Sequence, residues 1–121
     1  MRFRVYLSGP ITVGNQRRNY QQAVDAQIAV MALGHSVLNP MLTMQLPDSF
    51  SWKVWMECCL PWVEASDLVL RLPGYSRGAE LECRHARMNG ITVCSSMADL
   101  IATISRHQKA AERLKDEKTA Y

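Results

Sequence analysis

Long apolar runs, paired cysteines and clustered histidines are all missing from this sequence, and each absence excludes a class of protein. No apolar run approaches the roughly 20 residues that a membrane-spanning helix requires, so we expect no membrane partner. The four cysteines have no C-x-x-C spacing, which argues against a zinc site or a disulfide framework and favours reduced thiols. The three histidines are scattered without a partner spacing, so neither a metal centre nor a histidine-dependent catalytic triad is expected.

Signatures of nucleotide cofactors and of nucleic-acid binding are also missing. Gly9-Pro10 does not belong to a G-x-G-x-x-G fingerprint and no Walker motif is present, which argues against dinucleotide redox chemistry and NTP hydrolysis. The net charge is only +3, and residues 106–121 carry five Lys or Arg against three Asp or Glu, without clustered aromatic residues. Such a segment is typical of a solvated helix face, so we expect no nucleic-acid polymer as a partner. Because the N-terminus enters a strand pattern directly, we expect no signal peptide and a cytoplasmic location.

The composition, 48% hydrophobic and 21% charged over 121 residues, is that of one globular domain covering residues 1–121. Within it, strand and helix patterns alternate. Strands are predicted over residues 2–8, 35–38, 67–72 and 91–94, and helices over 18–33, 51–65, 76 onward and about 96–119. This alternation predicts an α/β fold, a three-layer sandwich around a Rossmann- or flavodoxin-like parallel sheet of four to five strands, with ligands at the carboxyl ends of the strands.

Apolar spacing predicts which faces of the first and last helices are buried. In the first helix Tyr20, Val24, Ile28 and Met31 recur at helical spacing and are predicted to face the core. In the last helix the spacing thins beyond Ser105, so this end is predicted either to protrude or to form a dimer contact.

The segment before the third predicted strand contains a loop and a helix. Residues 41–51 show no periodicity and are predicted to form a loop near the mouth of the site. In the following helix, Trp52 and Trp55 are expected in the core more often than at a ligand. Pro61 removes a backbone donor and is expected to kink that helix or divide it in two.

The stretch from residue 67 to residue 86 reads as a strand, a polar turn and a helix, and function is expected in the turn. Pro73-Gly74 ends the strand, and Ser76 is a candidate N-cap for the helix that follows. The free amides of the first helical turn, together with Gly78, offer a site for an anion.

Glu82 is the candidate reactive group of that helix. It lies at the edge of a stripe of small apolar residues, namely Ala79, Cys83 and Ala86. Glu80 has a basic partner four residues on, Arg84, whereas Glu82 has none. Open α/β sheets keep reactive groups near such a helix start, and the alternative is a carboxylate that merely interacts with the helix dipole.

Four motifs together carry a resemblance to a known family. They are Tyr6-Leu7-Ser8-Gly9-Pro10-Ile11, Leu38-Asn39-Pro40, Ser66-Asp67-Leu68-Val69 and Ser76-Arg77-Gly78-Ala79-Glu80-Leu81-Glu82. In order and spacing, over residues 4–93, they resemble the nucleoside 2-deoxyribosyltransferase superfamily, most closely its small phage-type members of unknown function. The resemblance extends to the deoxynucleoside 5′-monophosphate N-glycosidases. It does not cover the last helix.

The resemblance implies a catalytic role for three residues. Glu82 matches the family nucleophile, which attacks the anomeric carbon of the sugar. Asp67 matches an active-site aspartate that handles the leaving base or holds the sugar, and Tyr6 matches a tyrosine whose hydroxyl lies close to the nucleophile. A carboxylate that traps an oxocarbenium-like centre and a second group that delivers a proton to the base fit the chemistry of N-glycosidic cleavage.

The resemblance also implies a set of substrate-binding residues: Ser8, Gly9, Pro10, Asn39, Ser76 and Gly78. The first three would line the sugar and base side, and the last two would hold the 5′ end of the sugar. Arg77 adds a cation to the amides of the turn, which suggests a 5′-phosphate, although a solvated surface arginine is the alternative. Arg71 either reaches the mouth of the site or marks an edge of the sheet.

The functional hypothesis is cleavage of the N-glycosidic bond of a (2′-deoxy)nucleoside 5′-monophosphate or nucleoside through a covalent Glu82 glycosyl intermediate, with water or a second base as acceptor. No metal ion or organic cofactor is expected. The alternatives are a non-catalytic nucleotide-binding or sensing module and an interaction protein on the same fold. The resemblance implies a homodimer or larger homo-oligomer, for which Trp52, Trp55 and the last helix are the nominated contacts.

Overall fold

A computed structural model describes residues 1–43 and 50–119, and over these ranges the predicted α/β alternation is confirmed. The elements are β1 (Arg4–Ser8), α1 (Gln16–Ala32), β2 (Ser36–Leu38), the 3-10 helix η1 (Pro40–Thr43), α2 (Trp52–Glu64), β3 (Leu68–Arg71), α3 (Arg77–Met88), β4 (Thr92–Cys94) and α4 (Met97–Thr119). The strands form one all-parallel, four-stranded sheet in the order β2-β1-β3-β4. The fold is therefore flavodoxin-like, and its sheet has four strands, within the predicted range of four to five.

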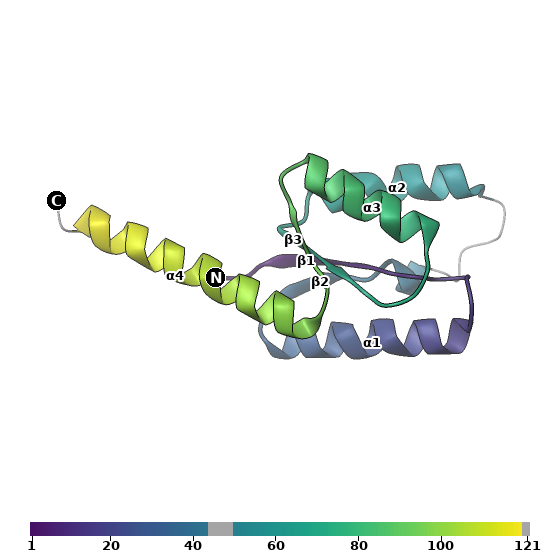
Figure 1. Cartoon of the computed structure of the whole chain (residues 1–121), viewed down its shortest axis with the longest axis horizontal. Helices are drawn as coiled ribbons and strands as arrows, with labels where there is room; N and C mark the ends of the chain where they lie inside the picture. The colour runs from purple at the N-terminus through teal and green to yellow at the C-terminus, as the bar shows by residue number, and fades with distance from the viewer. Residues whose placement is uncertain (44–49, 120–121) are drawn as a thin grey trace.

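The sheet is covered by helices on both faces, so the molecule has the three predicted layers (Figure 1). Side chains alternate along β1: Val5 and Leu7 join the core beneath α1 and the start of α4, whereas Tyr6 packs with α2 and α3. The face under α2 and α3 carries the polar side chains of β1, because Ser8 follows Tyr6 by two residues. This alternation determines which residues can meet α3.

Hydroxyl and amide side chains fix where the helices begin. Asn15, Ser51 and Ser76 cap α1, α2 and α3 by accepting from the backbone N–H three residues on, and Ser96 does the same before α4. The predicted Ser76 cap is thus confirmed. The predicted division at Pro61 is wrong, because α2 continues to Glu64. Pro61 lies in the last turn of α2, where its missing N–H removes only one of the final helical hydrogen bonds.

The predicted buried face of α1 is wrong. Tyr20, Ile28 and Met31 are exposed, and the residues that face the sheet are Asn19, Ala23, Ala26 and Val30. Small alanines allow the helix to lie close to β1 and β2, whereas the larger apolar side chains of the other face would hold it away.

The last helix projects beyond the body of the domain (Figure 1). Leu100 and Ile104 are buried against the sheet, while Leu114 is exposed. Of the two alternatives predicted for this end, the chain by itself shows the protruding helix. None of the helices in the described part of the chain is both long and apolar enough to cross a bilayer. Of the predicted loop over residues 41–51, residues 41–43 belong to η1, and residues 44–49 lie outside the described residues.

Candidate functional site

Strand alternation and the start of α3 bring Tyr6, Ser8 and Glu82 together beneath α2 and α3. Tyr6 and Ser8 point from β1 to this face, and both are completely buried. Glu82 lies on the face of α3 that packs against the sheet, together with Ala79, Cys83 and Ala86, and is only 7% exposed. The sequence placed Glu82 on the edge of this apolar stripe, and the structure buries it there.

Both oxygens of the Glu82 carboxylate accept hydrogen bonds from β1. The Tyr6 hydroxyl donates to Oε2, and the Ser8 hydroxyl donates to Oε1 over 2.9 Å. Ser8 Oγ also lies 3.5 Å from the Ala79 carbonyl oxygen, at the limit of a hydrogen bond. A buried carboxylate is costly unless such donors satisfy it. The two hydroxyls therefore hold the Glu82 carboxylate in one orientation, at the wall of the pocket described below.

Burial and hydrogen bonding act in opposite directions on the pKa of Glu82. Burial raises this pKa above the ordinary value, while the hydrogen bonds from Tyr6 and Ser8 and the positive charge of Arg71 lower it. The pKa of Tyr6 is raised, first by burial and then by the adjacent Glu82 charge. Tyr6 therefore stays protonated and acts as the hydrogen-bond donor to Glu82.

Two thiols also face this pair. Burial raises the pKa of Cys59, on α2, to about 11, and burial also raises the pKa of Cys83, on α3. Cys83 Sγ lies 4.0 Å from Ser8 Oγ. Both thiols therefore stay neutral near pH 7, and they do not add charge beside Glu82.

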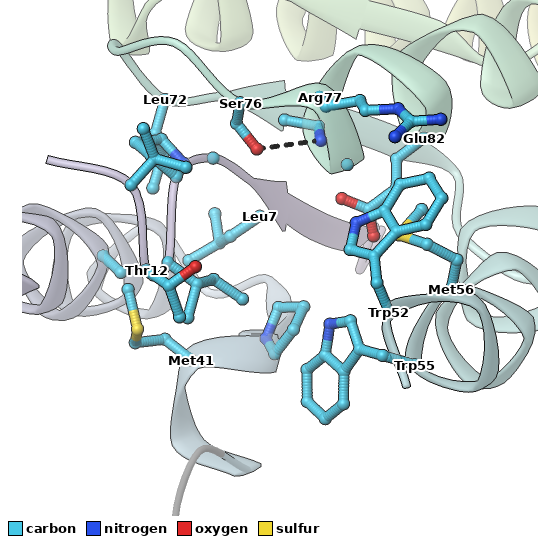
Figure 2. A pocket seen from close by; sticks show the side chains of 18 of the residues that line it. Leu7, Thr12, Met41, Trp52, Trp55, Met56, Leu72, Ser76, Arg77 and Glu82 are labelled. Atoms are coloured by element: carbon cyan, nitrogen blue, oxygen red, sulfur yellow. Dashed lines mark hydrogen bonds between the residues drawn. The ribbon is translucent and has the colours of Figure 1, made fainter. Parts of the chain in front are cut away.

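A pocket of about 330 Å³ opens onto the Glu82 carboxylate. Its wall is formed by the segment after β1, by the start of η1, by residues 50–56 and by the start of α3. Figure 2 shows Glu82 beside the Trp52 ring, with Ser76 and Arg77 on one side of the opening and Met41 on the other. The volume and the mainly apolar wall are typical of a small-molecule site.

The tryptophans of α2 belong to this wall and not to a closed core. Trp52 is 44% exposed, and Trp55 is partly buried against the cluster that contains Tyr6. The expectation that both lie in the core is therefore wrong for Trp52. Sequence reasoning missed this role because a tryptophan at the start of an amphipathic helix fits a core position equally well, and the signal available was its place directly after the predicted loop.

The turn before α3 is arranged around Ser76 and Arg77. Ser76 Oγ accepts from the Ala79 N–H over 3.1 Å, which leaves the Ser76 hydroxyl hydrogen free to bind a ligand. The Arg77 guanidinium carbon lies 4.4 Å from the centroid of the Trp52 ring, within the range of a cation–π contact. A Cβ at Gly78 would come within 3.3 Å of Met56 Sδ, so glycine allows α2 and α3 to approach here. Arg77 is thus oriented at the pocket rim.

The other predicted binding residues line the pocket in two different ways. Gly9 and Pro10 lie in its wall, and a Cβ at Gly9 would meet Leu72 Cβ at 2.8 Å, so the close approach requires glycine. The Asn39 side chain donates to Gln27 Oε1 and accepts from the Met41 N–H, both over 3.0 Å. Asn39 therefore holds η1 in place, and its amide is engaged within the protein.

Arg71 holds the turn that carries Ser76 and does not mark an edge of the sheet. Its guanidinium donates to the carbonyl oxygen of Leu72 and, over 2.9 Å, to that of Gly74. Gly74 has a φ of +112° and packs against Pro10, which few residues other than glycine could do. Arg71 thereby supports the pocket wall and places a positive charge near Glu82.

Asp67 does not reach this site, which corrects the placement implied by the resemblance. Its carboxylate accepts from the Arg4 backbone N–H over 2.7 Å and pairs with the Arg4 guanidinium over 3.1 Å. Asp67 is followed by Leu68, the partner of Val5, so it lies at the amino edge of the sheet, about 13 Å of strand from Ser8. Within the described ranges, no three metal-binding side chains gather to hold an ion.

The Asp67→Asn variant is accordingly expected to leave the chemistry of the Glu82 pocket unchanged and to alter acid stability. The Arg4 hydrogen bond holds the pKa of Asp67 below its usual range. The pair therefore contributes stability above the unfolded-state pKa of Asp67, and that contribution is lost as the pH falls through the lower folded-state value. Urea unfolding at about pH 7 and about pH 3 should show a modest loss for the variant at the higher pH only. A strong loss of activity or ligand binding at the Glu82 pocket in this variant would contradict the placement of Asp67 outside the site.

Comparisons with known proteins agree with this fold. The family described as "Domain of unknown function (DUF4406)" matches residues 3–95. No curated protein matches the chain. A 2-deoxyribosyltransferase from Bacillus psychrosaccharolyticus matches with a TM-score of 0.60 and 18% identity, over 75% of this chain and 69% of that one.

Two further solved structures show the same likeness. The Clostridium botulinum CMP N-glycosidase BcmB has a TM-score of 0.55 and 18% identity, over 75% of this chain and 66% of its own. A conserved protein from Enterococcus faecalis V583 has a TM-score of 0.62 and 23% identity, over 78% of this chain and 62% of its own. The chain thus spans about two thirds of these relatives. At such identities the likeness shows the shared fold alone.

Proposed function

The chain belongs to the family described as "Domain of unknown function (DUF4406)", and we propose that it cleaves the N-glycosidic bond of a nucleoside 5′-monophosphate or nucleoside, in the 2′-deoxy series. One observation carries this proposal: a buried carboxylate, Glu82, receives hydrogen bonds on both oxygens and faces an open pocket. The fold likeness to proteins named as a 2-deoxyribosyltransferase and a CMP N-glycosidase supports it.

The proposed chemistry uses Glu82 as the nucleophile. Departure of the base leaves positive charge on the anomeric carbon, and a carboxylate oxygen placed against that carbon stabilises the charge and forms a covalent glycosyl ester. Tyr6 and Ser8 keep the carboxylate oriented for attack. Water or a second base then releases the sugar from Glu82. The homodimer or larger assembly implied by the family resemblance is a further part of this proposal.

A non-catalytic nucleotide-binding module is the second candidate function, and one observation favours it. Among the residues that the structure describes, Glu82 is the only carboxylate that lines the pocket, because Asp67 lies at the other edge of the sheet. A neutral base needs a proton to leave, and the expected second carboxylate does not supply it. An assay for free base released from nucleosides and their 5′-monophosphates, with and without a second base, separates the two functions. No release from any compound would favour the binding module.

Arg77→Ala is expected to lower kcat/KM for 5′-monophosphates by about 10- to 100-fold, the value of a charge-assisted hydrogen bond, and to have little effect on nucleosides. The reason is the position of Arg77 beside the free amides of α3, where a phosphate would bind. Arg84→Ala removes an exposed arginine on the same helix and serves as the matched control. Equal losses on both substrate classes would show that Arg77 supports the pocket wall and does not bind phosphate.

A further inference from the structure

The described pocket wall contains one anion and one cation, and no group suited to protonate a leaving base. Glu82 and Arg77 are its only charged side chains, and the other described lining residues are apolar or carry hydroxyl, amide or indole groups. Arginine, hydroxyl and indole groups do not give up a proton near neutral pH. The Tyr6 hydroxyl already donates to Glu82, and the pKa of Tyr6 is raised, so this hydroxyl does not give its proton to a leaving base.

Glu82 itself cannot act as both nucleophile and acid in the same step. One of its oxygens must attack the anomeric carbon, and the carboxylate must be ionised to do so. General acid catalysis contributes about 10²- to 10⁴-fold where a proton must be delivered, and the described lining residues do not supply this contribution to a neutral base. A base that already carries a positive charge needs no proton, because it departs as a neutral molecule.

The pocket also suits a positively charged ring. Trp55 presents an indole in the wall, and such rings attract cations through their π faces. The neighbouring Trp52 already binds the Arg77 guanidinium in this way. Glu82 adds a negative charge at the position where the base meets the sugar. A zwitterionic nucleotide, with a cationic base and an anionic 5′-phosphate, would match the Glu82 and Arg77 charges of the pocket.

We propose that the preferred substrates of this pocket are 5′-mononucleotides whose base carries a permanent positive charge, as in N-alkylated purine or pyridinium nucleotides. The inference rests on the glycosidase function proposed above. A Glu82 oxygen forms a bond to C1′ while the C1′–N bond breaks, and the bonding electron pair neutralises the charge on the ring. Water then hydrolyses the glycosyl ester, which regenerates Glu82, frees the sugar 5-phosphate and releases one proton to solvent.

The test compares matched pairs of substrates on the full chain. The pairs are 7-methylguanosine 5′-monophosphate with GMP, and nicotinamide mononucleotide with its reduced, neutral form, each tested in the 2′-deoxy and in the ribo series. Each rate is divided by the uncatalysed rate of the same compound, because charged bases also leave faster without an enzyme. We expect a rate enhancement at least as large for each cationic compound as for its neutral partner. We also expect kcat/KM for nicotinamide mononucleotide, whose ring charge does not titrate, to rise with ionisation of Glu82 and then stay level.

Two controls make the outcomes distinct. Trp55→Leu should weaken binding of nicotinamide mononucleotide by roughly 2- to 30-fold, and Trp55→Phe should restore most of it, because both aromatic residues offer a π face. Larger enhancements for the neutral compounds, or a second, alkaline limb in the pH profile for nicotinamide mononucleotide, would reveal a proton donor and overturn this inference while leaving the glycosidase function intact. Base release from no compound at all would overturn the glycosidase function as well.

Discussion

Replacing Glu82 by glutamine is expected to reduce base release by about 10³- to 10⁶-fold, the range seen when a covalent nucleophile is removed. The amide keeps the size of the carboxylate, but it cannot form the glycosyl ester or balance positive charge on the anomeric carbon. Chromatographic detection of free base under single-turnover conditions measures the loss. Mass spectrometry of the acid-quenched wild type should show an added sugar phosphate that the variant lacks.

Stability measurements distinguish this loss from misfolding. Burial raises the pKa of Glu82 in the folded state, so wild-type stability falls as the pH rises from the unfolded-state pKa through the folded-state value. Glu82→Gln has no such ionisation and should resist urea at least as well as wild type near pH 7. The matched control is Glu80→Gln, which changes an exposed residue of the same helix and should keep full activity. Substantial activity in Glu82→Gln would contradict the nucleophile role.

Local signals predicted most of the elements that position this site. Pro73-Gly74 marks the end of β3, Ser76 caps α3, and β1 alternates so that Tyr6 and Ser8 share one face. These features depend only on residues close together in the chain, so they can be predicted from a single sequence. The burial of Glu82 follows from its place beside the stripe of small residues on α3.

Features that depend on distant packing were not predicted. The choice between two faces of α1 depends on how close Ala23 and Ala26 allow the helix to approach the sheet, and hydrophobic spacing alone favours the wrong face. The stack of Arg77 on Trp52 joins α3 to α2, and no local pattern indicates it. Asp67 is different, because it precedes β3 whereas Glu82 follows it. The order of Asp67, β3 and Glu82 along the chain indicates opposite edges of the sheet, but the resemblance led to the prediction that both carboxylates lie in the site.

Tyr6→Phe is the variant with the second largest expected effect, a loss of about 10- to 100-fold in base release at neutral pH, the value of a hydrogen bond to a charged group. The hydroxyl donates to Glu82 and favours its ionised form, so its removal should raise the pKa of Glu82 further. The acid limb of the pH–rate profile should therefore move to higher pH. Rates of base release measured across the pH range, for wild type and variant, test this shift.

The direction of that shift separates electrostatic support from simple packing. If Tyr6 only filled space, phenylalanine would preserve the profile, because it retains the ring in the same buried position. If the hydroxyl keeps Glu82 ionised, the variant should recover part of its rate at higher pH, where the carboxylate loses its proton without help. Tyr20→Phe, an exposed change on α1, should alter neither rate nor profile. A uniform loss at every pH would instead indicate that the Tyr6 hydroxyl orients Glu82 without affecting its ionisation.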